Sequence, residues 1–193
     1  MYRPPYFKQD DPAEQLRFMQ AHNFATLVSR EPFMATHLPV LVEEGKISGH
    51  VARANLHSKL DGQEVMVLFQ GPHAYVSAGW YEKTGQVPTW NYTAVHAYGT
   101  FREITDPEAI SHHLRTLVHF HEQHRSPAWD IDLTEEALQK MARAVVVFEI
   151  PLERLEGKYK LSQNRTLEER QRVMDSLQEE GGADVAALMK SHS

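Results

Sequence analysis

Residues 24–55 read FATLVSREPFMATHLPVLVEEGKISGHVARAN. Three segments with the composition of β-strands follow one another here, over residues 24–30, 32–43 and 46–55, without a helical pattern between them. The Glu44-Gly45 pair between the second and third segments is typical of a tight turn. Strands joined by short connections pair in antiparallel fashion, so this stretch predicts an antiparallel sheet.

The rest of the chain adds more strands and a set of separate helices. Further strands are expected at residues 64–69, 73–77, 90–104, 143–150 and 158–162, with Gly71-Pro72 breaking the run between the first two. Helices are expected to begin at Asp11 and to cover residues 106–124, 134–141, 166–180 and 183–190. This order predicts an α+β protein, built as an antiparallel barrel or sandwich with peripheral helices, and not as a βαβ sheet.

The domain organisation follows from length and from one capping signal. A chain of 193 residues suits one globular domain with a small appendage. Thr166 and Glu169 form a capping box, which marks the start of a new helix. We therefore expect a main domain over residues 1–165 and a C-terminal helical extension over residues 166–193 that packs on it.

Composition excludes several classes of protein. The chain has no cysteine, so disulfides and thiolate metal sites are excluded. It begins without the apolar run of a secretory signal and has no run of about 18 apolar residues that would suggest a membrane span, so a cytoplasmic location is expected. The net charge is −6 and the lysines and arginines are scattered, so charge does not support direct DNA binding.

Polar residues interrupt three of the predicted strands. They occur at residues 36–39, at residues 49–55 and in the ring-rich segment 88–92, which leads into a strand that also carries His96. Polar groups on largely buried strands need partners, and a phosphorylated, ring-bearing ligand would supply them. The alternative is that these residues partner one another at a barrel mouth or a dimer interface. A Rossmann or P-loop site is not indicated, since neither glycine-rich motif occurs.

The 12 histidines raise two further possibilities. His113, His121 and His124 share a helix face, but HExxH is absent and a solvated face explains them more simply than a metal site. One strand histidine could be an axial ligand to haem, although ordinary hydrogen-bonded histidines are the simpler explanation. The candidates for that role are His37, His50, His73 and His96.

Several strings, in one order along nearly the whole chain, carry a resemblance to a known family. They are Met1-Tyr2 with Pro4-Pro5 and Phe7, ATHLP at 35–39, GHVARAN at 49–55, FQGPHAYVS at 69–77, Trp80-Tyr81, VPTWNY at 87–92, VHAYG at 95–99 and KLSQNR at 160–165. With these strings the chain resembles the PaiB family of FMN-binding negative transcriptional regulators. The resemblance implies an FMN-binding split β-barrel that forms a homodimer, with the flavin at the subunit interface.

The resemblance also implies a set of cofactor-binding residues. Thr36, His37 and Leu38 would lie beside the flavin ring, and His50, Val51, Arg53 and Asn55 along the ribityl chain and phosphate. Trp90 and Asn91 would close the pocket. A late segment from the partner subunit would reach across the dimer with Lys160, Ser162, Gln163, Asn164 and Arg165.

The function implied is that of an FMN-binding regulatory protein that acts in negative transcriptional regulation as a flavin sensor. Because a fold does not fix an activity, two alternatives stay open. One is a flavin-dependent reductase or oxidase of a small molecule, for which no catalytic residue can be named. The other is a haem-binding split-barrel protein.

Overall fold

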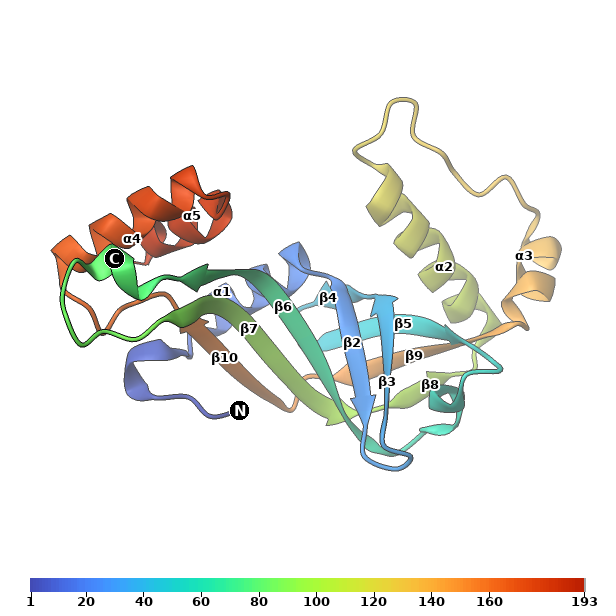
Figure 1. Cartoon of the computed structure of the whole chain (residues 1–193). Helices are drawn as coiled ribbons and strands as arrows, with labels where there is room; N and C mark the ends of the chain where they lie inside the picture. Colours follow the sequence, from blue (N-terminus) through green and yellow to red (C-terminus); the bar gives the residue numbers. More distant parts are fainter. Residues whose placement is uncertain (193) are drawn as a thin grey trace. The chain divides into compact units, whose positions relative to one another are not determined.

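The computed structural model describes residues 1–192, so Ser193, the last residue of the predicted extension, lies outside the described residues. The strands are β1 Lys8–Gln9, β2 Phe24–Ser29, β3 Met34–Pro39, β4 Leu41–Glu43, β5 Lys46–Ala52, β6 Glu64–Val76, β7 Thr89–Thr100, β8 Arg102–Ile104, β9 Val145–Pro151 and β10 Arg154–Lys160 (Figure 1). The α-helices are α1 Pro12–Ala21, α2 Pro107–Glu122, α3 Glu135–Ala142, α4 Leu167–Glu179 and α5 Ala183–Ser191. Three short 3₁₀ helices are η1 Pro5–Phe7, η2 Leu56–Lys59 and η3 Ala78–Tyr81.

The strands form two sheets with antiparallel pairing. One sheet has the order β1-β10-β7-β6-β2-β3 and the other the order β4-β5-β9-β8. Phe24 pairs with Pro39 in the β2–β3 hairpin, and Glu43 pairs with Lys46 across the Glu44-Gly45 turn, where Gly45 has a φ of +84°. The antiparallel architecture expected from residues 24–55 is thus confirmed.

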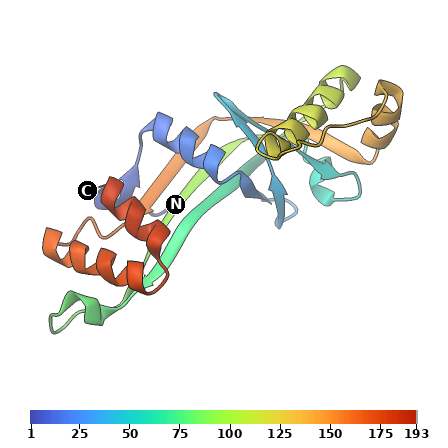
Figure 2. The same cartoon turned by 90° about the horizontal axis from the view of Figure 1, so that it is seen from above.

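The chain forms two compact units. The first comprises residues 1–18, 70–96 and 156–193, and the second comprises residues 19–69 and 97–155. Strands β6, β7 and β10 contribute residues to both units. In the first unit α4 and α5 lie side by side (Figure 2), and Arg170 Nη2 donates to the carbonyl of Met189 at 2.8 Å. The division into residues 1–165 and 166–193 stays a prediction.

Two predicted strands are each divided between the two sheets. The segment 32–43 becomes β3 and β4, separated by the buried Val40. The segment 90–104 becomes β7 and β8, separated by Phe101, whose N–H donates to the carbonyl of Gln63. At each junction the chain bends from one sheet into the other, within the apolar run LPVLV at Val40 and between Thr100 and the charged Arg102 at Phe101.

Strand β6 runs without interruption from Glu64 to Val76, so the expected break at Gly71-Pro72 is wrong. Gly71 is buried, and a Cβ there would lie 2.7 Å from Cε2 of Phe18. Glycine is therefore present because this strand position leaves no room for a side chain, and not because the strand ends.

Each unit has its own apolar core. In the second unit the rings of Phe101 and Phe148 stack with centroids 4.5 Å apart, and Ile47 and Ile150, which pair between β5 and β9, are both fully buried. In the first unit Tyr159 and Leu161 are buried, as are Leu177 and Met189 of the two C-terminal helices. Within residues 1–192, no helix is both long and apolar enough to cross a membrane.

Candidate functional site

A polar network in the second unit joins β2, β3 and the turn after β5. Asn55 caps η2, since its Oδ1 accepts from the N–H of His57 at 2.9 Å, and its Nδ2 donates to Thr36 Oγ1 at 3.1 Å. The imidazole of His57 lies between Thr36 Oγ1, 2.8 Å from Nδ1, and Ser29 Oγ, 3.0 Å from Nε2. His57 is fully buried, and desolvation lowers its pKa, which favours the neutral ring. The network holds the end of β5 against the β2–β3 hairpin.

Removing one hydroxyl from this network is expected to lower stability. Thr36→Val leaves the Nδ1 side of His57 and the Nδ2 of Asn55 without their partner, which we expect to cost about 1–2 kcal/mol of unfolding free energy. Urea unfolding at pH 7 measures this, with the exposed Thr84→Val as the matched control. Equal stability of the two variants would contradict a structural role for the Thr36 hydroxyl.

The other predicted residues of β3, of β5 and of the turn after β5 point in different directions. Arg53 Nε donates to the carbonyl of Arg143 at 2.8 Å and its Nη2 to that of Val145 at 2.7 Å, while its Nη1 lies 4.0 Å from a carboxylate oxygen of Glu103. His37 is exposed, with Nδ1 2.9 Å from Thr26 Oγ1. Leu38 and Val51 belong to the core. Two of the three side-chain nitrogens of Arg53 therefore donate to backbone carbonyls of this chain.

In the first unit the structure brings the start of β7 together with the end of β10. Lys160 Nζ donates to Thr89 Oγ1 at 2.5 Å and to the carbonyl of Trp90 at 2.6 Å. Asn91 is fully buried, and its amide and the hydroxyl of Ser162 hydrogen bond to each other at 3.0 and 3.2 Å. Ser162 has a φ of +62°, a left-handed conformation that turns the chain directly after β10.

The residues after Ser162 have separate roles. Gln163 folds back, its Nε2 donating to the carbonyl of Tyr159 at 2.6 Å. Arg165 Nη1 donates to Gln86 Oε1 at 2.7 Å, and its guanidinium lies 4.2 Å from the centre of the Tyr81 ring. Asn164 is exposed.

Positive charge gathers beside these residues. The pKa of Lys160 is lowered by burial and by the charges of Lys158 and Arg165. Across residues 1–192, neither Lys158 nor Lys160 forms an ion pair with a carboxylate; Lys158 instead lies over the rings of Tyr92 and Tyr2. In an acidic chain, a cluster of cations without paired carboxylates favours an anion.

An exposed aromatic surface adjoins this cluster. The ring of Trp90 is half exposed, with the rings of His73 and Tyr75 at centroid distances of 6.1 and 6.0 Å. The carbonyl of Trp90 is also an acceptor for Lys160. We call Lys158, Lys160, Arg165 and Trp90 the β7–β10 cluster. It offers donors for a phosphate and the face of a ring for stacking.

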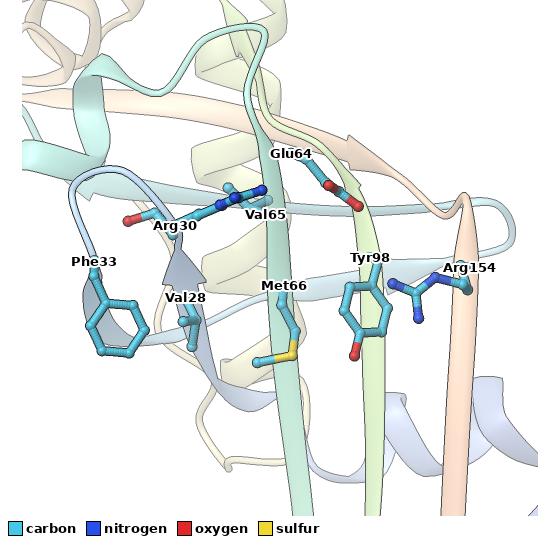
Figure 3. Close-up of a pocket in the computed structure, with 9 residues that line it drawn as sticks. Val28, Arg30, Phe33, Glu64, Val65, Met66, Tyr98 and Arg154 are labelled. Atoms are coloured by element: carbon cyan, nitrogen blue, oxygen red, sulfur yellow. The ribbon is translucent and has the colours of Figure 1, made fainter. Parts of the chain in front are cut away.

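A separate pocket of about 310 Å³ opens on the second unit (Figure 3). Arg30 and Phe33 lie on one side and Arg154 on the other, with its guanidinium 3.5 Å from the centre of the Tyr98 ring. The pocket is lined by Val28, Ser29, Arg30, Phe33, Glu64, Val65, Met66, Tyr98 and Arg154. Sequence reasoning named none of these as a site residue, although Glu64 and Met66 are two residues apart on β6 and so share one face of that strand.

The histidines of α2 do not form a metal centre. Among residues 1–192, no three side chains of the types His, Cys, Asp or Glu are grouped as metal ligands. Instead, His113 is buried, with its ring centroid 5.9 Å from that of His50.

Comparison with solved structures shows the fold. The chain is similar to the flavocytochrome Anf3 of Azotobacter vinelandii, with a TM-score of 0.65 and 15% identity, covering 86% of this chain and 72% of that one. It is also similar to the FAD and heme binding protein of Mycobacterium smegmatis, with a TM-score of 0.62 and 14% identity, covering 79% and 73% of the two chains. These likenesses confirm the predicted fold class, a split β-barrel of antiparallel strands with peripheral helices.

Comparison of sequences shows the family. Residues 1–154 match the model described as "Putative FMN-binding domain". The chain is also 37% identical over 190 residues to the "Protease synthase and sporulation protein PAI 2" of Bacillus subtilis, covering 93% of this chain and 90% of that protein. The chain therefore belongs to the PaiB family.

Proposed function

We propose that this chain binds FMN as a homodimer and acts as a flavin-sensing regulator of the PaiB type, in negative transcriptional regulation. Membership of a family described by its FMN-binding domain supports the cofactor. The observation that carries the proposal is the β7–β10 cluster, where three cations gather and Lys160 contacts the backbone carbonyl of Trp90, whose ring is half exposed. FMN presents a dianionic phosphate and a flat ring system, which are the two groups that such a cluster recognises.

The residues present fit this cofactor. Lys160 and Arg165 carry the charge and N–H donors that a phosphate needs, and both are fixed by hydrogen bonds to their own unit. Trp90 supplies a stacking face. In the proposed homodimer the ring neighbours, Thr36, Leu38 and the exposed His37, come from one subunit and the late segment with Lys160 and Arg165 comes from the other. Bound flavin would supply one- and two-electron redox chemistry, while these side chains bind and orient it.

Loss of the Lys160 charge is expected to weaken FMN binding. We expect Lys160→Gln to raise the Kd for FMN by about 10- to 150-fold, because a charged hydrogen bond to phosphate contributes about 1.5–3 kcal/mol. The exposed Lys59→Gln, in η2, is the matched control and should bind as the unchanged protein does. The measurement is a titration with FMN, followed by flavin absorbance and by quenching of flavin fluorescence.

Three outcomes would count against parts of this proposal. Protein that is colourless and takes up no FMN would refute flavin binding. Equal affinity of the Lys160 and Lys59 variants for FMN would show that the phosphate does not bind at the β7–β10 cluster. Sedimentation of the FMN-loaded protein as a monomer would contradict the proposed homodimer.

The regulatory role is tested separately. The net charge of −6 favours regulation without direct contact to DNA. We therefore expect that the protein does not shift the electrophoretic mobility of promoter DNA, even at low salt. Oxidation of reduced nicotinamide by the flavin-loaded protein would instead favour a reductase.

A further inference from the structure

A second cavity, of about 240 Å³, lies in the second unit and is lined by residues of α2, α3, the segment between them, β5 and β9. Figure 1 shows the course of α2, α3 and the segment that joins them. Its lining consists of His50 and ten apolar residues. Leu117 of α2 and Leu138 of α3 are buried parts of its wall. A cavity of this size suits a small organic molecule.

The rim of this cavity is unusually apolar. Trp129 is 60% exposed, Met141 63% and Leu133 38%, and all three line the cavity. Single exposed apolar side chains are common on protein surfaces, but several large ones around one opening are typical of a binding site. With no charged side chain in the lining, charge complementarity favours an uncharged ligand.

His50 gives the cavity its one polar group. Neither ring nitrogen has a hydrogen-bond partner among the described residues; Nδ1 is buried, which leaves Nε2 as the nitrogen open to a ligand. Burial lowers the pKa of His50 and so favours the neutral ring, which carries one N–H. Since a buried N–H without a partner is costlier than a buried lone pair, the hydrogen belongs on Nε2.

We propose that this cavity binds a small uncharged molecule with an apolar body of about eight to twelve non-hydrogen atoms and one oxygen acceptor, to which His50 Nε2–H donates. A ketone or an aldehyde on an aromatic ring has this chemistry. The ring would lie among the leucines and against Trp129, and the carbonyl would face His50.

Three probes of similar shape test this proposal by calorimetry at pH 7.5. Acetophenone has the ring and the carbonyl, ethylbenzene lacks the oxygen, and benzoate replaces the methyl group by a charge. We expect saturable binding of acetophenone, at least threefold weaker binding of ethylbenzene, and at least tenfold weaker binding of benzoate.

Two variants locate the site. Met141→Glu places a charge at the exposed rim and should weaken acetophenone binding at least fivefold, whereas Leu167→Glu, at an exposed helix position of the first unit, should leave it unchanged. His50→Phe should abolish the preference for acetophenone over ethylbenzene.

The proposal is overturned if acetophenone fails to bind up to its solubility limit, if benzoate binds as tightly, or if the Met141 and Leu167 variants bind alike. Should His50→Phe fail to fold, the three probes on the unchanged protein and the Met141 variant still decide the matter.

Discussion

Gly99→Ala is expected to cost about 3 kcal/mol of unfolding free energy, because overpacking a tight contact costs about 1–3 kcal/mol and backbone yields less readily than side chains. Gly99 is a buried residue near the end of β7. A Cβ there would overlap the carbonyl oxygen of Pro151 and lie 2.8 Å from Cγ2 of Ile150. The obstacle is the backbone of β9, so relief requires β7 and β9 to move apart.

The matched control is Gly79→Ala in η3. A Cβ at Gly79 meets only Ser77 Oγ, at 3.5 Å, which is an ordinary contact. Urea unfolding, with the midpoint and the slope fitted separately, measures both variants. If Gly99→Ala unfolds at the same urea concentration as Gly79→Ala, the close approach of β7 to Pro151 is incorrect.

The strand pattern predicted the architecture well but could not assign strands to sheets. Alternation and the Glu44-Gly45 turn fix antiparallel pairing locally, and the β4–β5 hairpin agrees. The change of sheet at Val40 and at Phe101 takes place at a single buried residue. Because the apolar run continues through Val40, and no glycine or proline stands between Thr100 and Ile104, neither junction carries a sequence signal for the end of a strand.

The contacts of the β7–β10 cluster could not be derived from local pattern. Lys160 and Thr89 are 71 residues apart in sequence, so only the resemblance to a family placed these two segments in one site. His57 was missed altogether, because its segment has the composition of a polar connector and its partners Thr36 and Ser29 lie 21 and 28 residues earlier. Such networks depend on which strands become neighbours, and spacing along the chain does not contain that information.

Acid is expected to destabilise the fold through His113. This residue of α2 is 6% exposed, and burial, together with the charges of His50, His112 and Lys46, lowers its pKa from 6.5 to about 4. Between these two values the unfolded chain binds a proton that the folded chain does not, so stability is full above pH 6.5 and falls as the pH falls towards 4. The loss amounts to about 3 kcal/mol, since each pKa unit corresponds to ~1.4 kcal/mol.

His113→Leu replaces this proton-binding group by an apolar side chain of similar size. We expect the variant to be at least as stable as the unchanged protein at pH 7, since Nε2 of His113 is buried without a partner. Between pH 7 and pH 4.5 it should lose about 2–3 kcal/mol less than the unchanged protein does. Burial also lowers the pKa values of His22, His50, His57 and His96, so part of the acid sensitivity should remain.

Urea unfolding at both pH values measures the difference, with the exposed His124→Leu as control. If His113→Leu and His124→Leu lose the same stability in acid, His113 is not the buried neutral histidine that the packing of α2 implies.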